Sequence, residues 1–152
     1  MDQRTRRLMP YRHSLAGTLL AAREAVMAPL RPILRDAGVT EQQWRVLRVI
    51  DDAESIDPTA LADRAILYAS SVTRILKELV ERELIVRTPD PADRRRSFVS
   101  LAVSGRTLLD DTSRRTVREL DRYAAAFGQP RLAVLLDELG ALIDAIGPVE
   151  AE

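Results

Sequence analysis

The sequence contains no cysteine and only one histidine, His13. Without thiols the chain has no disulfide framework and no thiolate chemistry, and a single histidine does not supply the ligands of a Cys/His zinc site. These absences exclude a thiol-based redox sensor and most transition-metal sensors. We therefore expect neither a bound metal nor a cofactor.

Long apolar runs are also absent. No segment approaches the roughly 20 consecutive apolar residues that cross a bilayer. The N-terminal residues MDQRTRRLMPYRHS lack the apolar centre of a secretory signal. We expect a cytoplasmic protein that does not contact a membrane.

The chain has little net charge and few glycines. Its 23 basic and 23 acidic residues cancel, so any argument for nucleic-acid binding must come from a local cluster of charge. With six glycines it contains no G-x-S-x-G, no glycine-rich phosphate loop, no H-E-x-x-H and no dinucleotide fingerprint. We expect no enzyme. A small aromatic-acid enzyme stays open as an alternative, because catalysis by Asp or Glu leaves no such motif.

The first pattern along the chain is a helical spacing of apolar residues. Apolar residues recur every three or four positions over residues 13–37, which predicts an amphipathic helix that Pro29 and Pro32 bend or interrupt near its end. Thr40 followed three residues later by Gln43 matches a capping box and predicts the start of a second helix.

The middle of the chain continues with two more helices. Asp57 followed by Pro58 predicts the N-cap and first position of a short third helix that ends at Ala65. A fourth helix is predicted over residues 70–83, because its apolar residues share one side.

The period of the pattern then changes from about 3.6 to 2. Residues 85–88 and 98–101 predict two short strands that form a β-hairpin. After Ser104 two more helical patterns follow, with Gly128 and Pro130 at the break between them.

The predicted fold is mainly α, a winged helix-turn-helix with a two-stranded β wing in residues 39–103. The helices in residues 1–38 and 104–147 carry apolar stripes outside this small core. We expect them to form a dimerisation lobe with a second copy of the chain, although both stripes folding back on their own chain is an alternative. Residues 148–152 form an acidic tail that we expect to be disordered.

The fourth helix is the candidate for contact with DNA. A helix of about 10–12 Å diameter fits the major groove, and polar side chains on its exposed side supply donors for base edges and phosphates. An ordinary solvated helix face has the same composition, so the helix alone does not distinguish a DNA-binding surface from a surface that only contacts water. The predicted contacts are Ser70, Ser71, Thr73, Arg74 and Lys77.

The hairpin loop strengthens the case for DNA. Its segment DPADRRRSFVSL places Arg94, Arg95 and Arg96 at a protruding tip, where guanidinium groups reach phosphates or the narrow minor groove. Asp93 is predicted to hold one arginine through a bidentate pair. A helix-turn-helix followed by a basic hairpin tip favours double-stranded DNA as the partner.

The sequence resembles the MarR family of winged-helix regulators over roughly residues 13–146. The resemblance lies in the order of elements and in Asp93-x-Arg95 leading through Val99 and Leu101 to Gly105. The stretches AREAVM and TEQQWRVLR are similar to the homoprotocatechuate (4-hydroxyphenylacetate) degradation regulators within that family.

The resemblance implies an obligate homodimer in which Asp93 orients the wing, Arg95 enters the minor groove and the helix from Ser70 contacts the major groove. Two positions depart from the family pattern. Ala102 stands where a capping Thr is common, so Ser104 is predicted to take over the cap, and Glu83 stands where Gly often ends the recognition helix.

A regulator without thiols or metal ligands needs another input, and a small organic ligand remains. Trp44 offers a face for an aromatic ring, while His13, Ser14, Arg23 and Arg45 are predicted to bind a carboxylate or phenol near the first two helices. The alternative is that Trp44 is an ordinary core residue and His13 a surface residue.

The function that these features predict is a homodimeric transcriptional repressor of an aromatic-acid catabolic operon. It binds a pseudo-palindromic operator and is released by a phenolic or aromatic carboxylate. A helical protein-interaction module without ligand response is the alternative from another class.

Overall fold

The computed structural model describes residues 8–147, and within them the chain is mainly helical with one two-stranded antiparallel sheet. The predicted tail at residues 148–152 lies outside the described residues. The elements in chain order are η1 (Tyr11–His13), α1 (Leu15–Met27), α2 (Leu30–Asp36), α3 (Glu41–Ala53), α4 (Pro58–Ala65), α5 (Ala69–Glu81), β1 (Ile85–Pro89), β2 (Ser97–Leu101), α6 (Val103–Phe127) and α7 (Gln129–Ile146).

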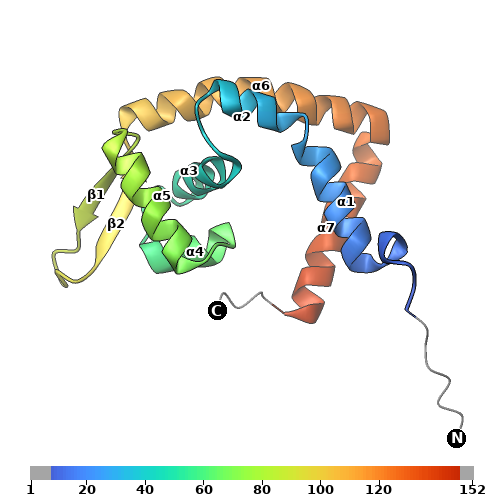
Figure 1. The fold of residues 1–152 in the computed structure, drawn as a ribbon, viewed down its shortest axis with the longest axis horizontal. Helices are drawn as coiled ribbons and strands as arrows, with labels where there is room; N and C mark the ends of the chain where they lie inside the picture. Colours follow the sequence, from blue (N-terminus) through green and yellow to red (C-terminus); the bar gives the residue numbers. More distant parts are fainter. Residues whose placement is uncertain (1–7, 148–152) are drawn as a thin grey trace, which may run out of the picture.

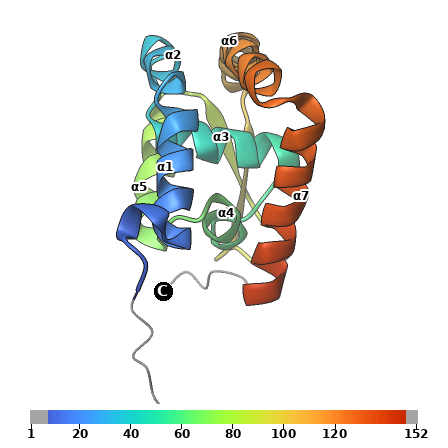
Figure 2. The same ribbon diagram turned by 90° about the vertical axis from the view of Figure 1, so that its right-hand side faces the viewer.

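The long helix α6 joins two parts of the molecule. Helices α3, α4 and α5 and the β1–β2 hairpin gather below one end of α6, and α1 and α7 descend from its other end (Figure 1). Seen from the side, α1 and α7 stand apart from each other (Figure 2). The mainly α, winged helix-turn-helix fold predicted from the sequence is confirmed.

The helix starts follow the capping residues. Thr40 Oγ1 accepts a hydrogen bond from the Gln43 backbone N–H at 3.1 Å, and Gln43 Oε1 accepts from the Thr40 N–H at 3.0 Å, which completes the predicted capping box. Asp57 Oδ1 accepts from two backbone N–H groups at the start of α4, as predicted. The predicted break near Pro29 separates α1 from α2.

The hydrophobic core belongs to the winged helix-turn-helix. Its buried side chains come from α3, α4, α5 and the hairpin, and they extend to Leu34 of α2 and Leu109 of α6. By contrast, α1 buries only Gly17 within its own chain and α7 buries no residue. Helices α1 and α7 therefore present apolar surface that nothing within residues 8–147 buries.

The wing is a short hairpin in which Ile85 pairs with Leu101 and Pro89 with Ser97. Ile56, between α3 and α4, adds a bridge to Val99 with hydrogen bonds of 3.1 and 2.9 Å. The wing is thereby joined to the body of the helix-turn-helix, which sets its direction.

The two departures from the family pattern have different outcomes. Glu83 adopts a φ of 57°, so the left-handed geometry persists without glycine, at a cost of roughly 1–2 kcal/mol. The prediction that Ser104 caps α6 is wrong. Ala102 is the N-cap and has no side-chain hydrogen bond, while Ser104 Oγ donates to the Glu83 carbonyl at 2.6 Å. The hydroxyl therefore ties the start of α6 to the turn after α5.

Gly105 marks the closest approach of α6 to this turn. A Cβ added there would lie 2.0 Å from the Leu84 carbonyl oxygen, which is backbone and cannot rotate away. We predict that Gly105→Ala lowers the free energy of unfolding by about 1–3 kcal/mol because the helix must shift. Urea denaturation at fixed protein concentration measures this. The control Thr107→Ala, at an exposed position of the same helix, should stay within about 0.5 kcal/mol; equal stability of Gly105→Ala and wild type would contradict the close approach.

Candidate nucleic-acid interface and effector pocket

The outer face of α5 carries the side chains predicted to contact DNA. Its buried side consists of Val72, Ile75, Leu76 and Leu79, which pack in the core. The polar residues lie on the opposite side, where Ser71 is partly buried and the others are exposed: Ser70, Thr73, Arg74 and Lys77.

Two of these side chains already have partners on α5. Thr73 Oγ1 donates to the Ala69 carbonyl at 3.0 Å, and Arg74 Nη1 lies 3.2 Å from Glu78 Oε1. Glu78 also accepts from Gln43 Nε2 at 2.8 Å. Arg74 is thus held against the helix by a carboxylate that α3 orients, while Lys77 has no ion pair within residues 8–147.

The wing tip is built by two aspartates. Asp90 Oδ1 accepts from the Ala92 N–H at 2.9 Å, and Asp93 Oδ1 accepts from the Arg95 N–H at 3.0 Å. The predicted bidentate pair between Asp93 and an arginine is therefore wrong: the Asp93 carboxylate holds backbone instead. Asx turns of this kind fix the loop that carries the arginines.

The three wing arginines are not equivalent. Arg94 and Arg95 are exposed, and the described part of the chain offers them no ion pair. Arg96 Nη2 lies 3.9 Å from Asp57 Oδ2, and its guanidinium lies 5.9 Å from the centre of the Phe98 ring. Arg96 is thus held toward the body, and the two freely extended charges at the tip are Arg94 and Arg95.

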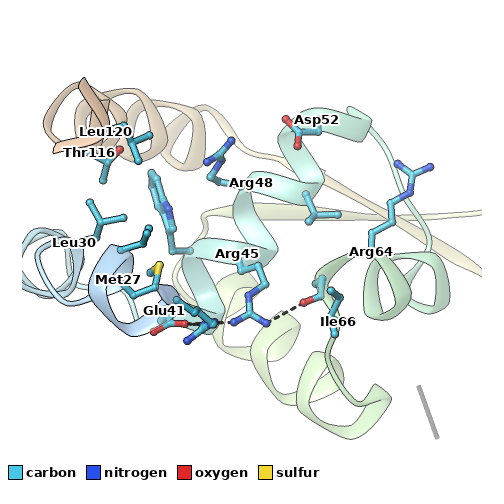
Figure 3. Close-up of a pocket in the computed structure, with 15 residues that line it drawn as sticks. Met27, Leu30, Glu41, Arg45, Arg48, Asp52, Arg64, Ile66, Thr116 and Leu120 are labelled. Carbon is cyan, nitrogen blue, oxygen red and sulfur yellow. Dashed lines mark hydrogen bonds and ion pairs between the residues drawn. The ribbon is translucent and has the colours of Figure 1, made fainter. Parts of the chain in front are cut away.

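A pocket of about 620 Å³ lies where α1, α2 and α6 meet the helix-turn-helix. One end is apolar and is formed by Met27, Leu30, Leu120 and the neighbouring Thr116; Asp52, Arg64 and Ile66 lie at the other end (Figure 3). The lining includes four arginines and two acidic residues, which leaves an excess of positive charge. Such a pocket suits an anion that carries an apolar group.

The structure brings three of the five predicted ligand residues together. Arg23, Trp44 and Arg45 line the pocket. His13 and Ser14 do not line it in this chain. Ser14 caps α1 by accepting from the Gly17 N–H and donates to the Tyr11 carbonyl, and His13 is exposed in η1.

Sequence reasoning missed four charged residues of the pocket: Glu41, Arg48, Asp52 and Arg64. Glu41 and Arg48 lie three residues before and four residues after Trp44, so helical spacing places them on its side of α3 and could have indicated them. Arg64 comes from α4, and no sequence signal links it to Trp44.

Ion pairs cluster around Glu41 at the first turn of α3. Its carboxylate contacts Arg23 from α1, Arg31 from α2 at 3.4 Å and Arg45 at 3.5 Å. Glu24 also pairs with Arg31 at 2.8 Å and with Arg23 at 3.6 Å, so two carboxylates face three guanidinium groups. Burial lowers the pKa of Arg45, and the nearby positive charge of Arg23 lowers it further. An added anion would stabilise this surplus of positive charge.

The turn between α4 and α5 also reaches the pocket. Ile66 ends α4 in the left-handed conformation, with φ 54° and ψ 57°, and its side chain is 65% exposed. A β-branched residue rarely adopts this geometry, so the surrounding contacts must hold it. One of them is the hydrogen bond from Arg45 Nη1 to the Ala65 carbonyl at 3.1 Å.

A helix-turn-helix, a basic hairpin and flanking helices that α6 connects to them together define a winged helix-turn-helix regulator. The family model described as "MarR family" matches residues 39–97. The chain belongs to the MarR family of transcriptional regulators, and the expectation that it is not an enzyme is confirmed by that membership.

Relatives and solved structures agree over most of the chain. The homoprotocatechuate degradative operon repressor of Escherichia coli is 34% identical over 85% of this chain and 89% of its own length. The HTH-type transcriptional regulator FarR of Neisseria gonorrhoeae is 33% identical over 82% of this chain and 85% of its own. The crystal structure of NadR in complex with 4-hydroxyphenylacetate is similar with a TM-score of 0.79 and 32% identity, covering 90% of this chain and 96% of NadR.

No helix within residues 8–147 has the length and apolar character needed to span a membrane. Over the same residues, no group of three or more His, Cys, Asp or Glu side chains gathers at a potential metal site.

The two basic surfaces predict separable effects on DNA binding. Arg95→Ala should weaken binding to every duplex and reduce the slope of log K against log salt by about 0.9, the value for one phosphate contact. Arg74→Ala should in addition relax base preference, because α5 is predicted to face the major groove. Fluorescence anisotropy over a salt series, with duplexes of varied sequence, measures both. A shallow slope for the wild type would favour an acidic protein as partner, and two variants that bind like the wild type would refute the assigned contacts.

Proposed function

We propose that this regulator is a homodimeric repressor of an aromatic-acid catabolic operon and that a phenolic or aromatic carboxylate releases it from DNA. The observation that carries the proposal is the pocket in which Trp44 lies beside arginines that outnumber the acidic groups. The names of two relatives support the chemistry, since one represses a homoprotocatechuate operon and another was solved with 4-hydroxyphenylacetate.

Dimerisation is proposed from the apolar surface at the chain ends. In the part of the chain that the structure describes, the 18-residue helix α7 buries no residue, which argues against the alternative that both stripes fold back on the monomer. Full burial of each large apolar side chain is worth about 1.5–3 kcal/mol, so a second copy that covers this surface gains much. The exposed large side chains are Leu15, Leu19, Leu20 and Val26 on α1, Val117, Leu120 and Phe127 on α6, and Val134, Leu135, Leu136, Ile143 and Ile146 on α7.

The dimer also gives the DNA geometry. Two symmetric copies of α5 would lie in successive major grooves about 34 Å apart, which calls for a pseudo-palindromic operator. Ser70, Ser71, Thr73, Arg74 and Lys77 would contact the major groove. Arg94 and Arg95 would reach the backbone or the minor groove on either side, with Asp93 shaping the wing loop, and Arg96 would add its charge closer to the body. We expect the protein to act in the cytoplasm, where such DNA lies.

Release is a shift between two dimer arrangements. A ligand bound between the dimer helices and the winged helix-turn-helix favours an arrangement whose α5 helices no longer match the groove spacing. To move the operator from almost fully bound to almost fully free, the ligand must prefer that arrangement by about 5.5 kcal/mol. The proposed ligand contacts in the pocket are Arg23, Trp44, Arg45 and Arg48. His13 and Ser14 remain in the proposal only as residues near the start of α1.

Dimerisation is tested by a charge on α7. Leu136→Glu, at a side chain 61% exposed in the single chain, should yield monomers and abolish specific DNA binding, because a buried unpaired carboxylate is costly. Sedimentation velocity measures the mass. Val103→Glu, at an apolar position exposed at the start of α6, is the matched control and should stay dimeric. A wild-type chain that stays monomeric at micromolar concentration would refute the proposal.

The effector is tested through the only tryptophan. 4-Hydroxyphenylacetate should change the fluorescence of Trp44 and release a duplex that the protein itself selects from a random library. Arg48→Met should raise the ligand Kd by ten-fold or more, as expected for a lost charged hydrogen bond of about 1.5–3 kcal/mol. Arg118→Met, an exposed change on α6, controls for the lost charge. Unchanged fluorescence and unchanged DNA binding at millimolar ligand would exclude this class of effector.

A further inference from the structure

One side chain joins the pocket to the turn that precedes α5. Arg45 lies between Glu41 and Ile66 in the pocket wall (Figure 3). Its Nη1 donates to the Ala65 carbonyl at 3.1 Å, while its Nη2 lies 3.5 Å from Glu41 Oε1. A guanidinium from α3 therefore holds the last carbonyl of α4 from inside the pocket.

That carbonyl belongs to the segment that sets the direction of α5. Only residues 66–68 separate α4 from α5. Ile66 and Leu67 donate their N–H groups back to Asp63 and Ala62 at 3.2 and 3.0 Å, which closes the end of α4 around the left-handed Ile66. A positive charge at the C-terminal end of a helix stabilises it, so Arg45 helps to hold a turn that its own sequence does not favour.

Arg45 is also poorly satisfied where it lies. Its only carboxylate partner among residues 8–147 is Glu41 at 3.5 Å, which also contacts Arg23 and Arg31, although Glu24 pairs with both of these as well. A carboxylate ligand in the pocket would be a stronger acceptor for this guanidinium than a neutral carbonyl. The contact to Ala65 is consequently the one that a bound anion can most easily displace.

We propose that Arg45 is a positioning residue: it pins the α4–α5 turn while the pocket is empty, and a carboxylate ligand draws its guanidinium away and frees the turn. This inference rests on the proposed function, in which the pocket takes an aromatic acid and α5 contacts DNA. It adds that the anionic group of the ligand, rather than its ring, causes release.

The pin is tested by hydrogen exchange on the full-length protein without ligand. In Arg45→Met the amides of Ile66 and Leu67 should exchange ten-fold or more faster, because a hydrogen bond from a charged donor is worth about that factor or more. Arg106→Met is the matched control, since it removes an equal charge and an ion pair to Asp51 of α3 at 3.2 Å without touching the turn. Equal exchange at Ile66 and Leu67 in both variants would refute the proposal that Arg45 stabilises the α4–α5 turn.

The role of the carboxylate is tested on the unmodified protein, so that no variant needs to fold. 4-Hydroxyphenylacetate should speed exchange at Ile66 and Leu67 and release the selected duplex. Its neutral analogue 4-hydroxyphenylacetamide should change Trp44 fluorescence yet leave both readouts within two-fold of the ligand-free value. Release by the amide at equal occupancy would overturn the inference.

The outcomes separate this inference from the proposed function. If the wild type selects no duplex, the proposed function fails. Hydrogen exchange in Arg45→Met still shows whether Arg45 stabilises the α4–α5 turn. If millimolar 4-hydroxyphenylacetate leaves both Trp44 fluorescence and DNA binding unchanged, the effector class fails and displacement by this acid is refuted with it. If the acid binds and releases DNA without faster exchange at the turn, the proposed function stands and the inference is wrong.

Discussion

The uneven distribution of buried apolar surface is the constraint on which the rest of the structure depends. The buried core is centred on the winged helix-turn-helix and reaches Leu34 of α2 and Leu109 of α6, whereas within residues 8–147 α7 buries no residue and α1 only Gly17. Apolar helices that long do not persist in water without a partner. The proposed second copy would cover these helices, and α6 connects them to the helix-turn-helix (Figure 1).

The pocket lies at the seam between these two parts. Its apolar end is formed by α1, α2 and α6, and its charged end by α3 and α4 (Figure 3). Ion pairs at such a seam are individually weak, but Glu41 gathers arginines from three helices at one point. A ligand that changes the charge there acts on several helices at once. In the proposed mechanism, this is how a small molecule alters the spacing of two DNA-binding helices without touching them.

The proposed DNA-binding surface is also more ordered than a simple cluster of charged side chains. Asp93 and Asp90 hold the backbone of the wing loop, so Arg94 and Arg95 extend from a formed turn rather than a flexible one. Arg96 is held by Asp57 and Phe98, and Arg74 by Glu78. Three consecutive arginines thus have different surroundings, and only two of them extend freely at the tip. The bridge from Ile56 to Val99 fixes the wing against the helices.

The sequence by itself determined the secondary elements and the family. Capping at Thr40 and Asp57, the interruption at Pro29 and the change of period at residue 85 act over a few residues, so local chemistry predicts them. Only the tertiary structure decided what the polar groups touch. Ser104 binds the Glu83 carbonyl instead of capping α6, Asp93 binds backbone instead of arginine, and Arg64 joins Trp44 in one pocket. Such partners depend on how distant helices pack, and residues that lie far apart in the chain carry no mark of their neighbours in space.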